Sequence, residues 1–127
     1  MKIAIPVKMK RENPPLAPLF GKAKWFAMVE GDTVEIVENP AQGGRAVVEW
    51  FLSEGVNAVI FQKMGMVPYE IIKASGSIDL FHAGYERVLL NDVLEKFNAG
   101  ELMKIDDTNV NSIIAHHEGK HSHGEKH

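Results

Sequence analysis

The sequence contains no cysteine. A chain without thiols cannot form disulfides, a thiolate nucleophile, or the cysteine-based motifs that hold zinc and iron–sulfur clusters. Any metal bound by this chain must therefore be held by histidine, carboxylate, methionine or backbone groups, or be carried by a partner.

Long apolar runs and a strong charge of one sign are also missing. The 127 residues carry a net charge of −3, with 45% hydrophobic and 24% charged residues. No run approaches the roughly 18–20 apolar residues that span a bilayer, and the opening MKIAIPVKMK has no signal-peptide segment. The weak net charge gives no reason to expect a nucleic-acid partner. We expect one cytoplasmic domain that binds neither nucleic acid nor membrane.

Recognisable catalytic motifs are absent as well. The first apolar stretch, KIAIPV, has no carboxylate of the kind that ribonuclease-H-type nucleases use to hold divalent metal. No G-x-S-x-G nucleophile elbow occurs, and the carboxylates fall on predicted polar faces. The sequence therefore indicates a protein that is not an enzyme.

The order of apolar patterns predicts an α/β fold. β-branched or alternating stretches indicate strands, and apolar residues at helical spacing indicate helices. The expected strands cover residues 2–7, 24–30, 33–39, 56–62 and a short stretch ending near His82, and the expected helices cover 45–55, 68–75 and 85–100. This order predicts a three-layer sandwich in which helices cover both faces of a mixed five-stranded sheet.

Candidate ligand-binding residues follow the expected strands, because open α/β sheets bind ligands at the carboxyl ends of their strands. His82 ends one strand, and its imidazole is suited to metal, although a hydrogen-bonded structural role is the alternative. A glycine pair that opens a helix can offer backbone N–H groups to an anion, unless it only provides loop flexibility. The candidates for cofactor binding are Phe20, Gly21, Gly43, Gly44, Lys63, Met64 and His82.

Six segments resemble the dinitrogenase iron–molybdenum cofactor biosynthesis family, in the family's order. They are MKIAIPV, LFGKAKWFAMVE, ENPAQGG, EGVNAVIFQKMG, YEIIKASGSIDLFHA and LEKFNAGEL, and together they cover about residues 1–105. The resemblance, to the domain of NifX, NafY and the C-terminal part of NifB, implies a ribonuclease-H-like fold without nuclease activity. It also implies that the protein binds, carries or delivers an iron–sulfur or iron–molybdenum cluster precursor. The family is associated with nitrogen fixation, and the sequence leaves open whether this chain takes part in it. Many members have a histidine directly before the Phe-Gly pair, whereas this chain has Leu19 before Phe20 and Gly21.

The last twelve residues, HHEGKHSHGEKH, hold five of the six histidines. We therefore divide the chain into a domain over residues 1–105 and a flexible His-rich tail over residues 106–127. Two pairs of these histidines are four residues apart, a spacing at which one helical turn can chelate nickel, zinc or copper. The alternative is a tail that binds nothing. The candidate metal ligands are His82, His116, His117, His121, His123 and His127.

The residues and the resemblance give a first hypothesis of a non-catalytic accessory protein that works with metal clusters or metal-assembly proteins. The alternative is an interaction or regulatory module that binds a partner protein or a small anion, with no metal role in the folded body. In that case the hairpin edge over residues 25–37 could extend the sheet across a homodimer, and the basic loop over residues 8–11 could contact an acidic partner.

Overall fold

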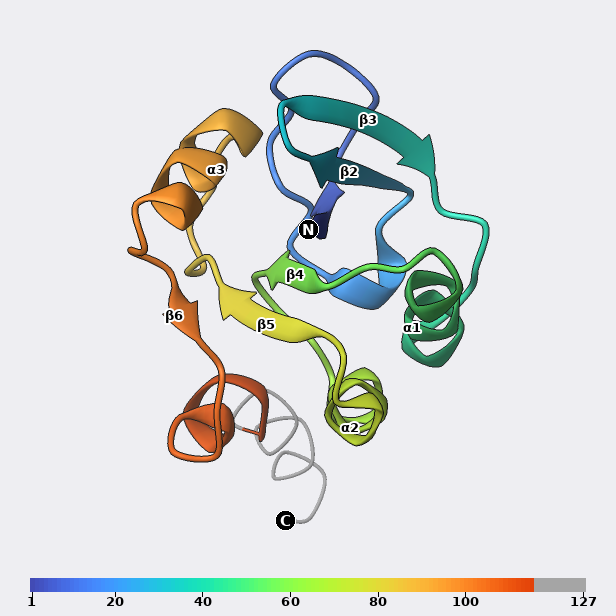
Figure 1. Cartoon of the computed structure of the whole chain (residues 1–127), viewed down its shortest axis with the longest axis vertical. Helices are drawn as coiled ribbons and strands as arrows, with labels where there is room; N and C mark the ends of the chain where they lie inside the picture. Colours follow the sequence, from blue (N-terminus) through green and yellow to red (C-terminus); the bar gives the residue numbers. More distant parts are fainter. Residues whose placement is uncertain (116–127) are drawn as a thin grey trace, which may run out of the picture.

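The computed structural model describes residues 1–115, which form an open mixed sheet with helices on both faces (Figure 1). The sheet has six strands in the order β3-β2-β1-β4-β5-β6. β1, β4 and β5 are parallel, whereas β2, β3 and β6 pair antiparallel to their neighbours. The strands are β1 (Lys2–Val7), β2 (Trp25–Glu30), β3 (Thr33–Glu38), β4 (Ala58–Phe61), β5 (Asp79–His82) and β6 (Met103–Lys104).

Two apolar cores lie on opposite faces of this sheet. One core joins the strands to α1 (Gly44–Ser53) and α2 (Met66–Ser75), through residues such as Phe51 and Ile72. The other joins them to α3 (Leu90–Asn98), through Leu90 and Val93. The three-layer α/β arrangement that the apolar patterns predict is therefore present.

The expectation of five strands is wrong, because β6 forms a sixth. β6 has only two residues, Met103 and Lys104, and both are exposed. It pairs antiparallel with β5 and extends the sheet on the side opposite to β3. A strand of this length has no apolar alternation by which the sequence could reveal it.

The segment between β1 and β2 is packed, although its prolines and basic residues favour an extended loop without packing of its own. Leu16 and Phe20 are buried in the two cores. The backbone N–H of Leu16 donates to the Val88 carbonyl at 3.0 Å, and Pro15 forms a bridge with Leu89. These contacts keep residues 88 and 89 extended, so α3 begins at Leu90 and not near residue 85.

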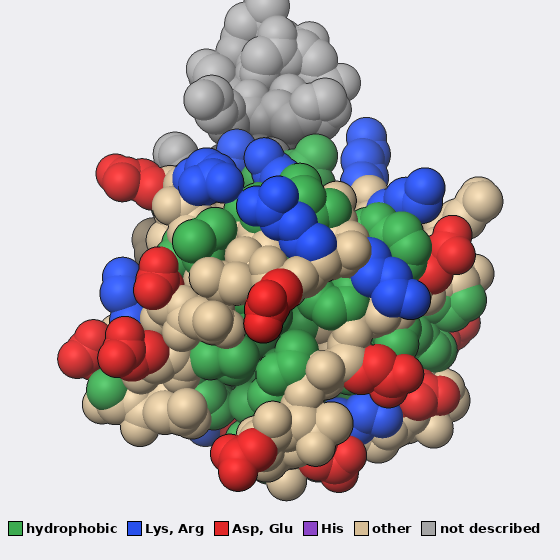
Figure 2. All heavy atoms as spheres, turned by 90° about the horizontal axis from the view of Figure 1, so that it is seen from above, with side chains coloured by type: hydrophobic (Ala, Val, Ile, Leu, Met, Phe, Trp, Pro, Cys, Tyr) green, Lys and Arg blue, Asp and Glu red, His purple; other side chains and the backbone are tan. Residues whose placement is uncertain are grey.

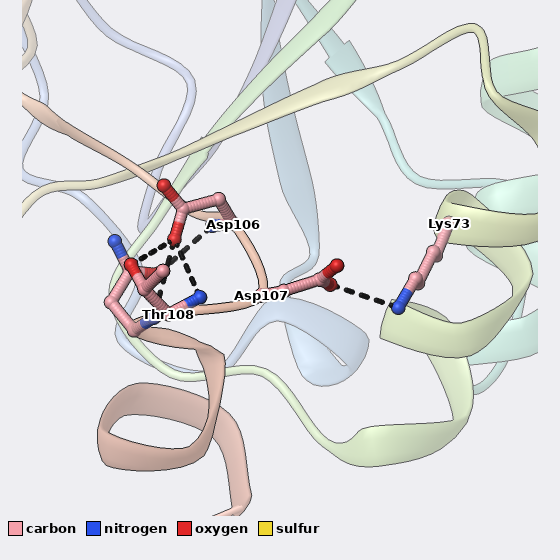
Figure 3. A network of polar contacts seen from close by, with 5 residues as sticks. Lys73, Asp106, Asp107 and Thr108 are labelled. Atoms are coloured by element: carbon pink, nitrogen blue, oxygen red, sulfur yellow. Dashed lines mark hydrogen bonds and ion pairs between the residues drawn. The ribbon is translucent and has the colours of Figure 1, made fainter.

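Residues 106–115, which we assigned to the tail, pack against the body. Val110 and Ile114 belong to the core on the α1 and α2 side. The Asp106 carboxylate accepts hydrogen bonds from the Thr108 backbone N–H at 2.8 Å and from the Thr108 hydroxyl at 2.5 Å (Figure 3). These bonds fix the turn that leads into the π-helical turn η2 (Asn111–Ala115). The folded body thus extends beyond residue 105.

Within residues 1–115, no helix is both long enough and apolar enough to cross a bilayer.

Candidate functional site

One pocket of about 430 Å³ lies where the 3-10 turn η1 (Phe20–Lys22) meets the N-termini of α1 and α2. It adjoins the residues that follow β4, in agreement with the rule that α/β sheets bind ligands beyond the carboxyl ends of their strands. The pocket is lined by Leu19, Phe20, Gly21, Lys22, Gly43, Gly44, Lys63, Met64, Gly65 and Pro68. Six of the seven candidate cofactor-binding residues therefore lie together, and His82 is not among the lining residues.

Backbone hydrogen bonds attach η1 to the end of β4. The Lys63 N–H donates to the Pro18 carbonyl, and the Phe20 N–H donates to the Lys63 carbonyl, each at 3.0 Å. The Phe20 side chain is buried and packs edge-on against Phe26 and Phe51. The buried ring anchors η1 to the sheet and α1, which positions Gly21 and Lys22 at the pocket.

Glycines let the backbones of η1 and the start of α1 approach each other. A Cβ atom added to Gly21 would lie 3.2 Å from the backbone nitrogen of Gly44, closer than most side chains tolerate. Gly43, the N-cap of α1, has a φ of 87°, in the region that favours glycine. A side chain at position 21 or 43 would therefore be strained. Simple loop flexibility, the alternative explanation of the glycine pair, does not account for this requirement.

The pocket has the electrostatics of an anion site. The N-caps of both helices, Gly43 and Gly65, make no side-chain capping bond, and neither helix has an acidic residue in its first turn. In α1 the first intrahelical bond runs from the Val47 N–H to the Gly43 carbonyl, so the N–H groups of residues 44–46 precede it. Helix N-termini carry partial positive charge, and Lys22 and Lys63 add full charges.

His82 is buried beside this region, and it contacts protein groups. Its Nε2 atom lies 3.0 Å from the Gln62 carbonyl oxygen, and its ring packs against Phe61 and Tyr85. Burial lowers the pKa of His82, with the Gln62 carbonyl opposing that shift. A neutral imidazole donating to Gln62 explains this arrangement. Coordination of a metal through Nε2 would require the ring to give up this bond, so the metal role of His82 stays a prediction.

Among residues 1–115, no group of three or more histidine, cysteine, aspartate or glutamate side chains is placed to hold a metal ion. His116, His117, His121, His123 and His127 lie outside the described residues.

Sequence reasoning did not identify the N-terminus of α2 as part of the pocket. Pro68 indicates a helix start, but the helix begins at Met66, two residues before the proline. Gly65 therefore becomes the N-cap and joins the lining together with Pro68 and Lys22. The signal available in the sequence was Gly65 shortly before Pro68, since glycine is accepted at helix N-caps and proline in the first turn.

Comparison with known proteins gives a consistent result. The family model described as dinitrogenase iron-molybdenum cofactor matches residues 1–100. An uncharacterized protein of Methanocaldococcus jannaschii is 32% identical over 116 residues, which cover 84% of this chain and 92% of that protein. The NMR structure of a putative NifB protein from Thermotoga is 26% identical with a TM-score of 0.65, covering 80% of this chain and 90% of that one.

The apo form of the orange protein from Desulfovibrio gigas shares the fold. Its TM-score is 0.72 at 18% identity, and the alignment covers 82% of this chain and 92% of that chain. This likeness concerns the arrangement of strands and helices alone.

Proposed function

This chain belongs to the dinitrogenase iron-molybdenum cofactor family, and we propose that it is a non-catalytic accessory protein that carries an anionic metal cluster. The cargo is an iron–sulfur or iron–molybdenum cluster precursor, held in the pocket between η1, α1 and α2. The protein would work in the cytoplasm, together with the proteins that assemble such clusters.

The single observation that carries this proposal is the convergence of two uncapped helix N-termini and two lysines on one pocket. A sulfide-bridged cluster is large, anionic and a weak hydrogen-bond acceptor, so backbone N–H groups and lysine side chains suit its surface. The volume of about 430 Å³ lies within the range of ligand pockets. Met64, which is 2% exposed, is the one sulfur-containing side chain in the lining.

The absence of thiols from the sequence supports a carrier role. Proteins that keep an iron–sulfur cluster permanently hold it through cysteine thiolates. A pocket that offers hydrogen bonds and charge would bind a cluster without covalent ligation by cysteine, and release would require no metal–thiolate bond to break. Such binding suits transfer between proteins.

The strand order also supports the finer classification as ribonuclease-H-like, with an antiparallel β1-β2-β3 meander next to parallel β4 and β5. No carboxylate lies on β1, which agrees with a member of that fold class that has lost, or never had, nuclease chemistry.

Anaerobic reconstitution tests the cluster proposal. The purified protein is mixed with iron and sulfide, desalted, and examined for visible absorbance that elutes with the protein. Lys63→Met removes a lining charge while keeping an unbranched side chain of similar length, and we expect it to lose most of this absorbance. Lys96→Met, on the exposed surface of α3 across the sheet, is the matched control and should behave like the natural protein.

Equal absorbance of the Lys63→Met and Lys96→Met variants would contradict the proposal. His82→Ala should reduce the absorbance if the imidazole is a ligand, and an unchanged spectrum would remove His82 from the site. Binding of inorganic phosphate by a protein that binds no cluster would favour the alternative function, a module that binds a small anion in the same pocket.

We further propose that the histidines at 116, 117, 121, 123 and 127 form a second, independent site for nickel, zinc or copper. Its support is the spacing of the imidazoles in the sequence.

A further inference from the structure

The edge strand β3 offers an open row of backbone groups. It lies at the end of the strand order, and its six residues pair with β2 in unbroken register from Thr33 to Glu38. Edge strands are commonly protected by proline, lysine or a bulge, and β3 has none of these. In Figure 1 it runs along the upper side of the molecule, where no helix or strand of the described chain lies beyond it and the loop after β1 is drawn above it.

The direction of the free backbone groups follows from one hydrogen bond. The Asn39 N–H donates to the Lys24 carbonyl at 2.8 Å, so the backbone groups of Asn39 point toward β2. Positions whose backbone groups bond to the neighbouring strand alternate along an antiparallel pair, so the N–H and C=O groups of Val37 and Glu35 also point toward β2. The N–H and C=O groups of Val34 and Ile36 therefore point toward the open edge.

The two sides of this edge differ in chemistry. On the α1 side, a hollow of about 190 Å³ is lined by Glu30, Glu35 and Glu54 together with the indole of Trp50. Lys2 lies 3.4 Å from Glu54, whereas Glu30 and Glu35 have no ion-pair partner among residues 1–115. This side is acidic, and an aromatic ring next to it adds attraction for a cation.

On the α3 side, the edge has the apolar side chains of Val34 and Ile36, with charged residues of both signs nearby. Val34 is 45% exposed and lines two hollows of about 450 and 430 Å³, the first shared with Ile36 and the second with Phe97. Lys10, Arg11 and Glu12 line the hollow next to Ile36. Figure 2, which looks onto the molecule from above, shows exposed hydrophobic side chains across the middle of this face, with most basic side chains in the upper part of the view and acidic side chains on both sides and below.

From these two sides we infer that β3 binds an extended segment of another protein in which basic and apolar residues alternate. In a strand added to β3, alternate side chains face opposite sides of the sheet. Lysine or arginine would face Glu30 and Glu35, and apolar side chains would face Val34 and Ile36. The reverse orientation would place the partner's cations beside Lys10 and Arg11.

A second copy of this chain lacks the cations that would complement this edge. Antiparallel pairing of β3 with itself keeps equal faces together, so its centre falls on one residue. A centre at Glu35 places two glutamates opposite each other, and a centre at Ile36 places Val34 opposite Glu38. β3 has no basic residue, so no register pairs its glutamates with a cation. In the register centred at Glu35, like charges lie opposite each other, which destabilises a sheet.

The test uses a blocked peptide of alternating lysine and valine, six residues long like β3, added to the full-length protein. We expect binding, with slower hydrogen exchange at the Val34 and Ile36 amides measured by NMR. A peptide with glutamate in place of lysine should not bind. Glu35→Lys should weaken binding by about tenfold or more, whereas Glu101→Lys, an equal charge change near the opposite edge, should leave it unchanged.

Val34→Pro gives a second test, since proline removes an N–H that points outward and is tolerated on edge strands. It should abolish peptide binding while circular dichroism stays native. Equal binding by the natural protein, Glu35→Lys and Val34→Pro would overturn the proposal, as would no binding at all. A homodimer in analytical ultracentrifugation that Val34→Pro separates would also overturn it, because the occupant would then be a second copy.

Discussion

Gly44 at the start of α1 lies directly against the ring of Pro68 in α2. A Cβ atom added to Gly44 would be 2.8 Å from the Pro68 Cγ and 3.0 Å from its Cδ. The proline ring is rigid, so the contact fixes the separation of the two helix N-termini that form the pocket. The same two residues line the pocket. The geometry of the candidate anion site therefore depends on a glycine at position 44.

Gly44→Ala should destabilise the protein, although alanine normally favours a helix over glycine by about 1 kcal/mol. The added methyl group must move α1 away from α2, and overpacking of this kind costs about 1–3 kcal/mol. Urea unfolding should show a lower midpoint, and cluster or phosphate binding should weaken because the N–H groups no longer converge. Adding Pro68→Ala should restore part of the lost stability, and strictly additive effects of the two substitutions would contradict the explanation.

His82 should make stability depend on pH. Burial lowers the pKa of His82 in the folded protein, so the unfolded chain takes up a proton at higher pH, near about 6.5. The contribution of neutral His82 to the free energy of unfolding is fully present above that pH. It is lost as the pH falls from about 6.5 toward the lowered pKa.

His82→Gln, which keeps an N–H donor for the Gln62 carbonyl, should flatten this dependence in urea unfolding between pH 5 and pH 7.5. The other histidines are common to both proteins, so their contributions cancel in the comparison. If both proteins show the same pH dependence, the folded state does not disfavour protonation of His82.

The strands β1, β2 and β4 were predictable because each has a buried apolar run of its own, and β3 was predictable because apolar and polar residues alternate along it. β1 has the bounds that the apolar pattern predicts, Lys2–Val7. The late start of α3 was not predictable, since Val88 and Leu89 continue the helical spacing of apolar residues. They stay extended because of contacts with Leu16 and Pro15, more than 70 residues away in the sequence. Local periodicity contains no information about such contacts.

The pocket was partly predictable for a topological reason. The carboxyl ends of parallel strands meet at one edge, so the residues after β1 and β4 had to be neighbours. His82 follows the same rule in its backbone position, but its side chain turns to Gln62 and Tyr85. The direction of one side chain depends on its packing partners, which strand order does not determine. The roles of all these residues as ligands remain predictions.

Asp106→Ala should destabilise the C-terminal segment. The carboxylate accepts N–H bonds from Thr108 and Asn109, and the Thr108 bonds lower the pKa of Asp106. This contribution is present above the ordinary aspartate pKa of about 3.9 and is lost as the pH falls through the lowered value. Thermal unfolding should show a reduced melting temperature for Asp106→Ala and a smaller reduction for Asp106→Asn.

Asp107→Ala is the matched control for that measurement. It removes the ion pair at 3.0 Å with Lys73 (Figure 3), whose two side chains are largely exposed. Exposed ion pairs contribute little to stability, so the melting temperature should hardly change. A larger effect at Asp107 than at Asp106 would show that the ion pair, and not the turn, holds this segment.

Two truncations should separate metal binding from folding. Deleting residues 116–127 removes five histidines and none of the described core, so we expect native stability and loss of nickel and zinc binding in isothermal titration calorimetry. Deleting residues 106–127 also removes Val110 and Ile114, which are 8% and 0% exposed. Loss of two buried aliphatic side chains costs several kcal/mol, on the order of 2–5 for each large one, and should lower the melting temperature strongly.

The metal affinity of the natural protein should fall below about pH 6.5, because imidazole must lose its proton to coordinate a metal. Replacing all five histidines with glutamine keeps the length of the chain and should match the shorter truncation. If the natural protein and the form lacking residues 116–127 bound nickel equally well, the tail would have no part in binding. The ligand would then have to lie in the folded body, where His82 is the one imidazole among residues 1–115.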